Sequence, residues 1–354
     1  MLIFAAEPEF YLWRRQSSPA VEQAVAEFYR QSKGALYFLA GELENNGKVI
    51  SVPPAPMVKF DRATAVIRIH IRHLSKAPAQ LAAEIAKLYT PWQKCKKLQI
   101  DLDCPERKLD YYPALMVELR KLLPAAELSA TVLPCHLSHT KNFTALARSC
   151  DYFVLQIHGL HQQKGKWQII DKKAVIKAWN QAIALKRPFK TAIPLYCSFV
   201  GNQTILPDLD FTAKLAKIAA DHGGTIGFRL GVSGERDTLD LHSAMKLCSG
   251  EKPVAEISAR WKKHPSGTWH LFITSAGEFA RKVTIPLSFP PEMKISDLDT
   301  FGQAFLSAGR DSLTLELPPA GKEIPCLWLR LEKDFDLNKF NPFITTIKKG
   351  TANL

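Results

Sequence analysis

Two different periods of apolar and polar residues run along the chain, and the change between them divides it. From residue 9 to about 250, short apolar runs typical of buried strands alternate with segments whose apolar residues recur at helical spacing, such as Val21, Val25 and Phe28. The predicted strands are 9–14, 35–41, 65–72, 97–103, 127–134, 152–158, 189–198 and 225–231. This alternation predicts parallel strands joined by right-handed crossovers.

Eight strands in about 240 residues have the size of a (β/α)8, TIM-like barrel. An open doubly wound sheet is the alternative α/β fold, but its glycine-rich phosphate loop is missing after the first strand, where Trp13-Arg14-Arg15-Gln16 stands instead. One interval differs from the others, because Asn45-Asn46-Gly47 predicts a hairpin turn rather than a helix. We therefore expect a barrel over residues 1–250.

Helical periodicity stops near residue 250. Short alternating runs follow at 255–261, 268–274, 281–288, 312–317 and 325–331, separated by turn signals such as Pro265-Ser266-Gly267. This pattern predicts a small C-terminal β-sandwich over 254–332 and a C-terminal extension over 333–354. Trp261, Trp269 and Trp328 are expected in the sandwich core. The domain is expected to pack against the barrel and stabilise it, with sugar binding as the alternative role.

Composition and charge narrow the class of protein. The chain has 354 residues, of which 46% are hydrophobic, and no apolar run approaches the ~20 residues of a transmembrane segment. The net charge is +13, but lysine and arginine are scattered, and the densest cluster is Lys94, Lys96 and Lys97. No basic run is interleaved with aromatic residues, so we expect a solvated basic surface and no nucleic-acid partner.

The cellular compartment is indicated only weakly by the sequence. The seven cysteines form no CxxC pair, and their odd number argues against a disulfide scaffold. The first six residues, Met1-Leu2-Ile3-Phe4-Ala5-Ala6, are apolar but shorter than the roughly 7–15 residues of a signal-peptide core. They are either a remnant of such a peptide or an ordinary start. A periplasmic or exported location is favoured over a cytoplasmic one, and the oligomeric state is not indicated.

Two carboxylates project from one face of the fourth predicted strand. Leu98, Ile100 and Leu102 lie on one face of this strand, and Asp101 and Asp103 lie on the other. Ionised groups are rarely buried without a partner or a task. Since a helix follows the strand, the acids lie at the edge of the barrel where active sites are built. One carboxyl group could protonate a glycosidic oxygen while the second stabilises the positive charge on the sugar.

Polar side chains near the ends of other strands are expected to face the same site. The inward set comprises Arg68, His70, Arg72, His136, Gln156, His158, Tyr196, Ser198 and Arg229, with Trp13 and Tyr37 as aromatic neighbours. Among them, we expect Trp13, Arg72, Gln156, His158, Tyr196 and Arg229 to contact a substrate.

Three alternatives remain open for these residues. Arg68 and Arg229 could neutralise Asp101 in a structural ion-pair network. The aromatic residues could serve only to pack the barrel. His136, His158 and Asp103 could bind a metal ion, although we expect no metal and no other cofactor.

The order of these segments resembles a bacterial family known only as a domain of unknown function (number 3142). The matching residues are Leu98-Gln99-Ile100-Asp101-Leu102-Asp103, Leu119-Arg120, Leu123-Pro124, Leu128-Ser129-Ala130-Thr131-Val132-Leu133-Pro134 and Val154-Leu155-Gln156-Ile157-His158. The likeness extends over most of the chain, including the sandwich. The family name implies no activity.

More distantly, the barrel is similar to the chitinase-like glycoside hydrolases of family 18. In that family a motif Asp-x-Asp-x-Glu ends the fourth strand, and its glutamate is the acid. The resemblance implies that Asp103 is the stabilising carboxylate, Asp101 its charge partner and Glu106 the general acid. This chain departs from the motif, because the glutamate comes one residue late and Pro105 stands at the position of the acid.

The sequence thus favours a carbohydrate-active protein of the glycoside hydrolase type, which acts on an amino-sugar or cell-envelope polysaccharide. Its expected partner is a carbohydrate ligand. The alternative is a non-catalytic polysaccharide-binding or envelope protein on a degenerate hydrolase barrel. The two hypotheses differ in whether the turn repositions Glu106 toward the two aspartates.

Overall fold

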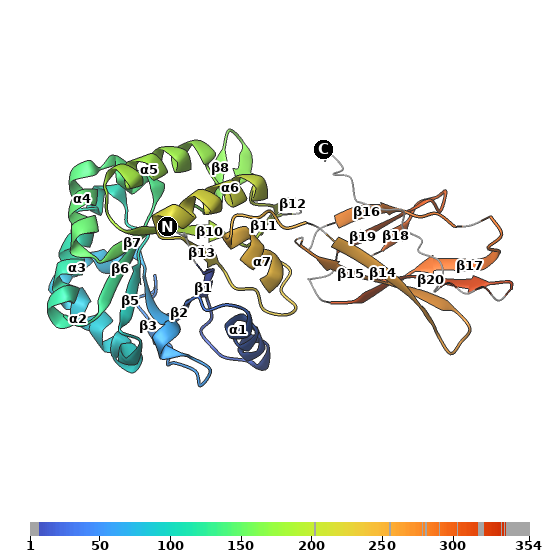
Figure 1. Cartoon of the computed structure of the whole chain (residues 1–354), viewed down its shortest axis with the longest axis horizontal. Helices are drawn as coiled ribbons and strands as arrows, with labels where there is room; N and C mark the ends of the chain where they lie inside the picture. The colour runs from blue at the N-terminus through green and yellow to red at the C-terminus, as the bar shows by residue number, and fades with distance from the viewer. Residues whose placement is uncertain are drawn as a thin grey trace. The chain divides into compact units, whose positions relative to one another are not determined.

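The computed structural model describes residues 7–337 apart from 202, 255, 278, 280, 281, 290, 303, 318–321, 334 and 336. The chain forms two compact units (Figure 1). One unit comprises Met1–Val232 and Leu241–Pro253, and the other comprises Ser233–Asp240 and Val254–Leu354. The expected C-terminal extension lies almost entirely outside the described residues, and the apolar start of the chain lies outside them too.

Eight parallel strands close into a barrel in the first unit. They are β1 (Glu9–Leu12), β2 (Leu36–Leu43), β4 (Ala63–Ile69), β5 (Lys97–Asp101), β6 (Glu127–Val132), β7 (Tyr152–Gln156), β10 (Phe189–Pro194) and β13 (Thr225–Phe228). Each pairs with the next strand in this order, and β1 pairs with both β2 and β13, which closes the ring. The predicted barrel is confirmed, although seven of the eight strands end earlier than the sequence indicated.

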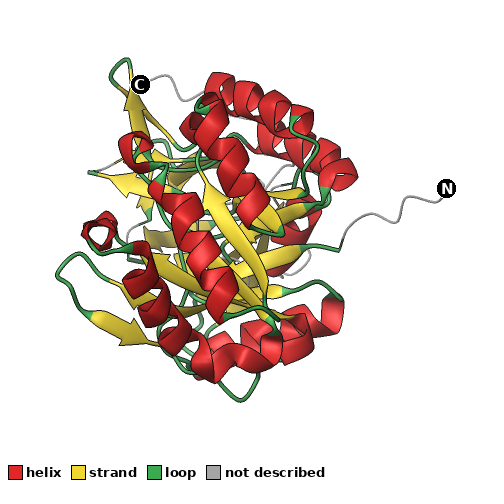
Figure 2. Cartoon of the chain, turned by 90° about the vertical axis from the view of Figure 1, so that its left-hand side faces the viewer, coloured by secondary structure: helices red, strands yellow, loops and turns green. Residues whose placement is uncertain are grey.

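Helices surround these strands (Figure 2). They are α1 (Pro19–Gln31), α2 (Pro78–Tyr89), α3 (Tyr111–Leu122), α4 (Thr140–Ser149), α5 (Lys172–Ala184), α6 (Leu209–Ala219) and α7 (Leu241–Cys248). Helix α1 shows why they form: the Ser18 side chain caps it by accepting from the Val21 amide, and its apolar stripe is buried. Within that stripe, the ring of Phe28 packs edge-on against Phe10 of β1 at 5.4 Å. None of the described helices is long and apolar enough to cross a lipid bilayer.

Short elements follow several barrel strands. The hairpin predicted at Asn45-Asn46-Gly47 is present, since β3 (Val49–Ser51) pairs antiparallel with β2. Two hairpins that the sequence did not indicate follow β7 and β10, namely β8 (His161–Gln163) with β9 (Lys166–Gln168), and β11 (Ser198–Val200) with β12 (Gln203–Ile205). Single turns of 3-10 helix are η1 (Phe60–Arg62), η2 (Ile71–Ser75), η3 (Thr90–Cys95), η4 (Glu106–Lys108), η5 (Pro134–Ser138) and η6 (Ala220–His222).

Side chains fill the middle of the barrel. A buried cluster there contains Tyr11, Tyr37, Val66, Val154, Ala192 and Ile226. Within it, the Tyr11 hydroxyl donates to Gln99 Oε1 at 2.8 Å. Nearer the amino ends of the strands, the Lys190 ammonium pairs with Glu9 at 2.6 Å. Because the interior is packed, a ligand has access only to the ends of the barrel.

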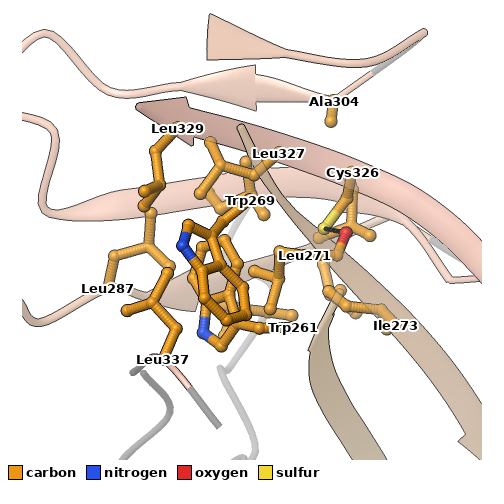
Figure 3. Packing of buried hydrophobic residues seen from close by; sticks show 14 of the residues in the cluster. Trp261, Trp269, Leu271, Ile273, Leu287, Ala304, Cys326, Leu327, Leu329 and Leu337 are labelled. Atoms are coloured by element: carbon orange, nitrogen blue, oxygen red, sulfur yellow. Dashed lines mark hydrogen bonds between the residues drawn. The ribbon is translucent and has the colours of Figure 1, made fainter. Parts of the chain in front are cut away.

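The second unit contains two antiparallel sheets. One sheet has the order β14 (Glu256–Lys263), β15 (Trp269–Ala276), β20 (Ile324–Leu331) and β17 (Ile295–Thr300), and the other has the order β16 (Lys282–Pro286), β19 (Ser312–Glu316) and β18 (Phe305–Leu306). A single hydrophobic cluster contains residues of both sheets (Figure 3). Strands β17 and β18 were not predicted, because β17 has the polar sequence ISDLDT and β18 has two residues.

The tryptophans of this unit do not all lie in its core. Trp261 and Trp269 belong to the hydrophobic cluster, as the sequence predicted. For Trp328 the prediction was wrong, since this side chain is partly exposed and does not belong to the cluster. It alternates along β20 with the buried Leu327 and Leu329, so it projects from the opposite face of the sheet.

Candidate functional site

A cavity of about 150 Å³ lies at the carboxyl end of the barrel. It is lined by Tyr11, Trp13, Arg68, Asp101, Asp103, Thr131, Gln156, His158, Gly159, Tyr196 and Phe228. These residues come from the ends of seven barrel strands or from the turns just after them. Six of the site residues expected from the sequence line this cavity: Trp13, Asp101, Asp103, Gln156, His158 and Tyr196.

Glu106 does not line the cavity. Strand β5 ends at Asp101, and the turn through Pro105 carries Glu106 into η4 at the surface, where 52% of its side chain is exposed. Its carboxylate pairs with His139 Nε2 at 2.5 Å, and this hydrogen bond lowers the pKa of Glu106. Of the two alternatives left open by the sequence, the turn therefore does not bring Glu106 into the cavity.

Arg72 and Arg229 also lie outside the lining of the cavity. Strand β4 ends at Ile69, three residues earlier than predicted, so Arg72 lies in η2, where its exposed side chain donates to the Asn45 carbonyl at 2.9 Å. Strand β13 ends at Phe228, whose ring lines the cavity in place of Arg229. In both cases the predicted strand is longer than the strand in the structure. The alternation of inward and outward side chains therefore does not apply to the residues beyond its end.

The acidic side of the cavity is held by a row of charged residues across three neighbouring strands. Glu42 of β2 lies opposite Arg68 of β4, which lies opposite Asp101 of β5. The Arg68 guanidinium is 3.6 Å from the buried Glu42 carboxylate, which also pairs with Arg15. Because Glu42 shares the charge of Arg68, this arginine compensates Asp101 only in part.

The carboxyl group of Asp101 is the most perturbed acid of this site. Burial raises its pKa from 3.8 to about 6, and the neighbouring Asp103 adds to the shift. A hydrogen bond from the Thr131 hydroxyl to Asp101 Oδ1, 2.9 Å long, opposes it. Asp103 is exposed. The pair thus combines a buried carboxyl group that holds its proton near pH 6 with a second, solvent-facing carboxyl group.

The opposite side of the cavity is aromatic. The ring of Phe228 lies 5.6 Å from Trp13, 5.7 Å from Tyr196 and 4.9 Å from the imidazole of His158. The Tyr196 hydroxyl lies 3.4 Å from His158 Nδ1. An acidic wall facing a wall of rings gives the cavity one polar and one apolar side.

His158 is a neutral member of this aromatic wall. Burial lowers its pKa to about 3, so the imidazole carries no charge at neutral pH. Its Nε2 is buried and makes no hydrogen bond to the described part of the chain. The geometry therefore fits an uncharged hydrogen-bonding group rather than a general acid.

The residues considered as metal ligands do not come together. Both ring nitrogens of the buried His136 are engaged, with Nε2 at 2.7 Å from the Cys104 carbonyl and Nδ1 accepting from the Leu133 amide at 3.1 Å. Within the described ranges, no group of three or more histidine, cysteine, aspartate or glutamate side chains could hold a metal ion. The alternative of a site built from His136, His158 and Asp103 is not supported.

Several residues of the cavity were not expected from the sequence. Tyr11 precedes Trp13 by two positions, so the alternation used for β5 would have placed both on the same side. Thr131 could have been found in the same way on β6. Nothing in the sequence marked Phe228 or Gly159, which line the cavity only because two strands end beside it.

A larger cavity of about 630 Å³ lies at the other end of the barrel, beside the amino ends of β6, β7 and β10. Three of its ionic side chains are paired: Arg120 with Asp151 at 2.6 Å, and Lys190 with Glu9 at 2.6 Å. At this end of a TIM-like barrel, side chains serve stability rather than chemistry. We therefore take the smaller, acidic cavity as the candidate functional site.

Replacing Asp101 by asparagine is expected to stabilise the barrel at neutral pH. In the unfolded chain this aspartate titrates near 3.8 and in the folded chain near 6, so the folded state binds more protons between these values. Stability therefore falls as the pH rises from about 4 to about 6, by up to about 3 kcal/mol. Urea unfolding across this range should show the fall in the wild type and not in Asp101→Asn. Parallel curves for the two proteins would contradict the assignment.

Comparisons with known proteins bear on the fold, a TIM-like barrel, and on the family that the sequence resembles. Residues 61–207 match the model of a family described as Domain of unknown function (DUF3142), which confirms the resemblance for this segment, where all the matching residues quoted above lie. The match does not extend to residues 254–332, where the likeness was also expected. The matched segment contains both aspartates and the elements from β4 to β12. No curated protein matches the chain.

Solved structures similar to this chain include glycoside hydrolases. A chitinase from Chromobacterium violaceum is 12% identical with a TM-score of 0.50, over 69% of this chain and 99% of that one. The spore cortex-lytic enzyme SleL of Bacillus cereus is 14% identical with a TM-score of 0.47, over 69% and 73% of the two chains. A Pyrococcus furiosus chitinase domain is 12% identical with a TM-score of 0.42, over 63% and 83%. The first likeness shows that the barrel has the fold of that chitinase.

Proposed function

We propose that the barrel is a carbohydrate-active module of the glycoside hydrolase type, which acts on an amino-sugar or cell-envelope polysaccharide. The observation that carries this proposal is the pairing of Asp101, whose pKa is raised to about 6, with Asp103 in one cavity. The aromatic wall opposite them supports it, because a sugar ring has apolar faces and a polar rim. Aromatic side chains can cover such a face while carboxylates bind the hydroxyl groups.

In the proposed reaction the two carboxyl groups have different roles. Asp101, protonated near pH 6, donates its proton to the glycosidic oxygen as the bond to the anomeric carbon breaks. Asp103 faces the positive charge that develops on the sugar ring. A water molecule then adds to the anomeric carbon, the shortened glycan leaves as the alcohol, and the proton released by the water returns to Asp101. Separate environments for two neighbouring acids produce this division, since burial keeps one protonated and exposure leaves the other solvated.

The size of the cavity limits what it can enclose. At about 150 Å³ it is smaller than the ~300–1,000 Å³ typical of pockets for whole small-molecule ligands. We therefore propose that it encloses one sugar unit of a longer chain. The polysaccharide of a cell envelope would be met in the periplasm or outside the cell, and we propose that location for the protein. We further propose that the two sheets of the second unit form a β-sandwich accessory domain.

A second candidate function is polysaccharide binding without turnover. The position of Glu106 favours it, because this glutamate pairs with His139 outside the cavity and Pro105 stands where the acid of the related hydrolases is expected. In that case Asp101 and Asp103 would bind sugar hydroxyl groups and no bond would break. The same cavity would then recognise a glycan without cleaving it.

Replacing Asp103 by asparagine is expected to separate these two functions. If the barrel is a hydrolase, the variant should lose turnover of chito-oligosaccharides and peptidoglycan fragments by about 10²-fold or more, because the developing charge loses its carboxylate. Its affinity for the same oligosaccharides, measured by calorimetry, should stay within a few-fold of the wild type.

The wild type itself decides between the candidates. Release of reducing ends from any glycan of the panel supports a hydrolase. Calorimetric binding without turnover supports the binding protein. If the wild type neither binds nor cleaves any glycan of the panel, both functions are refuted.

A further inference from the structure

The second unit carries a row of aromatic and polar side chains on one sheet face, which the barrel site does not use. On β15, the side chains of His270 and Phe272 alternate with the buried Trp269, Leu271 and Ile273. They therefore project from the face of the four-stranded sheet opposite the hydrophobic cluster, here called the outer face. Trp328 of β20 projects from the same face, as described above.

Strand pairing arranges four of these side chains across the sheet. Lys262 lies opposite His270, which lies opposite Trp328, and Trp328 in turn lies opposite Asp299. Directly opposed side chains in antiparallel strands lie on the same face and close together. With neighbouring strands about 4.8 Å apart, the row spans about 14 Å.

Further rings extend this row. The imidazole of His264 stacks on His270 with centroids 4.8 Å apart, and the Phe301 ring lies edge-on to the imidazole of His270 with centroids 5.0 Å apart. The Lys262 ammonium lies 4.3 Å from the centroid of the Phe272 ring. The outer face of the other sheet differs, since Thr284 and Thr314 pair there by their hydroxyl groups.

Three cations of the outer face have carboxylate partners and remain open to solvent. Arg260 and Lys262 both bind the Glu323 carboxylate, and Arg330 lies 3.7 Å from Asp297. The exposed fractions of the Arg260, Lys262 and Arg330 side chains are 64%, 43% and 54%. Cations that already have carboxylate partners do not favour a nucleic acid or an anionic lipid. The charge balance fits an uncharged, hydroxyl-rich ligand.

We propose that this outer face binds a neutral polysaccharide chain. A pyranose ring lies with its apolar face on the indole of Trp328, which removes apolar surface of both from water. The Asp299 carboxylate and the Lys262 ammonium lie at the two ends of the row. They form charge-assisted hydrogen bonds with hydroxyl groups of the polysaccharide chain. This binding is independent of Asp101 and Asp103, so the proposal goes beyond the function of the barrel cavity.

Retention of the full chain on insoluble chitin and cellulose tests the proposal. Trp328→Ala should weaken binding to the polymer that retains the wild type about tenfold, because the stacking surface is lost. The matched control is Phe305→Ala, which removes an aromatic side chain that is 59% exposed on β18 of the other sheet. This control should bind as the wild type does.

The remaining outcomes are also decisive. If Trp328→Ala perturbs folding by circular dichroism, the exposed Asp299→Ala replaces it and should weaken binding several-fold. A wild type that neither polymer retains, or equal retention of the Trp328 or Asp299 variant and the Phe305 control, overturns the proposal. Loss of retention in Trp328→Ala in a protein without turnover on any glycan would support this face while refuting the hydrolytic function of the barrel.

Discussion

Asp101→Asn is expected to lower glycan turnover by about 10²–10⁴-fold, the range by which a positioned acid contributes to catalysis. The buried carboxyl group of Asp101, with a pKa of about 6, is the proton donor of the proposed reaction, and an amide cannot give up that proton. In the wild type the rate should fall as the pH rises through about 6, because the acid is then ionised. Residual turnover by the variant should lack this fall.

Glu106→Gln is the matched control for this experiment. Both residues are acids that follow or end the same strand, but Glu106 is bound to His139 at the surface and does not line the cavity. Its replacement should leave the turnover rate within a few-fold of the wild type, and the rate should still fall as the pH rises through about 6. A loss of turnover in Glu106→Gln with full turnover in Asp101→Asn would reverse the assignment of the acid.

Asp101→Asn is expected to raise stability and to lower turnover, and these opposite effects make the two predictions more informative together than apart. The same burial that raises the pKa of Asp101 costs stability at neutral pH, so the asparagine variant should be more stable and less active. A purely structural aspartate would show no such opposition, because its loss would lower stability without a change in the pH profile. Measuring both quantities on one variant therefore tests whether burial of Asp101 serves a reaction.

The barrel and the acid pair could be predicted from the sequence for one physical reason. Successive strand side chains alternate between the two faces, so Asp101 and Asp103 could be placed on one face of the predicted strand 97–103 before the fold was known. The pairing of β1 with both β2 and β13 followed from eight regularly spaced strands, most of them followed by a helix. Periodicity in these segments is a local property of the chain.

What the sequence could not predict depends on where each strand ends. The alternation of residues continues in the sequence past Ile69 and Asp101. In the structure, however, the strands end at these residues and the chain turns toward η2 and η4. Arg72 was assigned to the site by this continuation and Glu106 by the resemblance to the family 18 motif, and both lie at the surface. The sequence allowed Arg68 to compensate Asp101, but not the part that Glu42 takes, because Glu42 is distant in sequence from both and joins them only through the ring of strands.

Gly223→Ala is expected to destabilise the barrel by about 2–5 kcal/mol. This glycine ends η6 with φ of 104°, where an L-residue costs roughly 1–2 kcal/mol. An added Cβ would also lie 2.2 Å from the carbonyl oxygen of Phe189 at the start of β10, so the backbone must shift, at a further cost of about 1–3 kcal/mol. The next residue, Gly224, accepts the hydrogen bond from the Thr191 amide that docks β13 on β10.

Gly47→Ala separates the two causes of this loss. Gly47 has a similar φ of 86°, but an added Cβ there meets no atom within 4 Å. Urea unfolding of the full chain should show a loss of about 1–2 kcal/mol for Gly47→Ala, and a clearly larger loss for Gly223→Ala. Equal losses would mean that β13 tolerates the displacement. Because β13 carries Phe228 to the cavity, a shift of this strand should also weaken oligosaccharide binding in Gly223→Ala and leave it unchanged in Gly47→Ala.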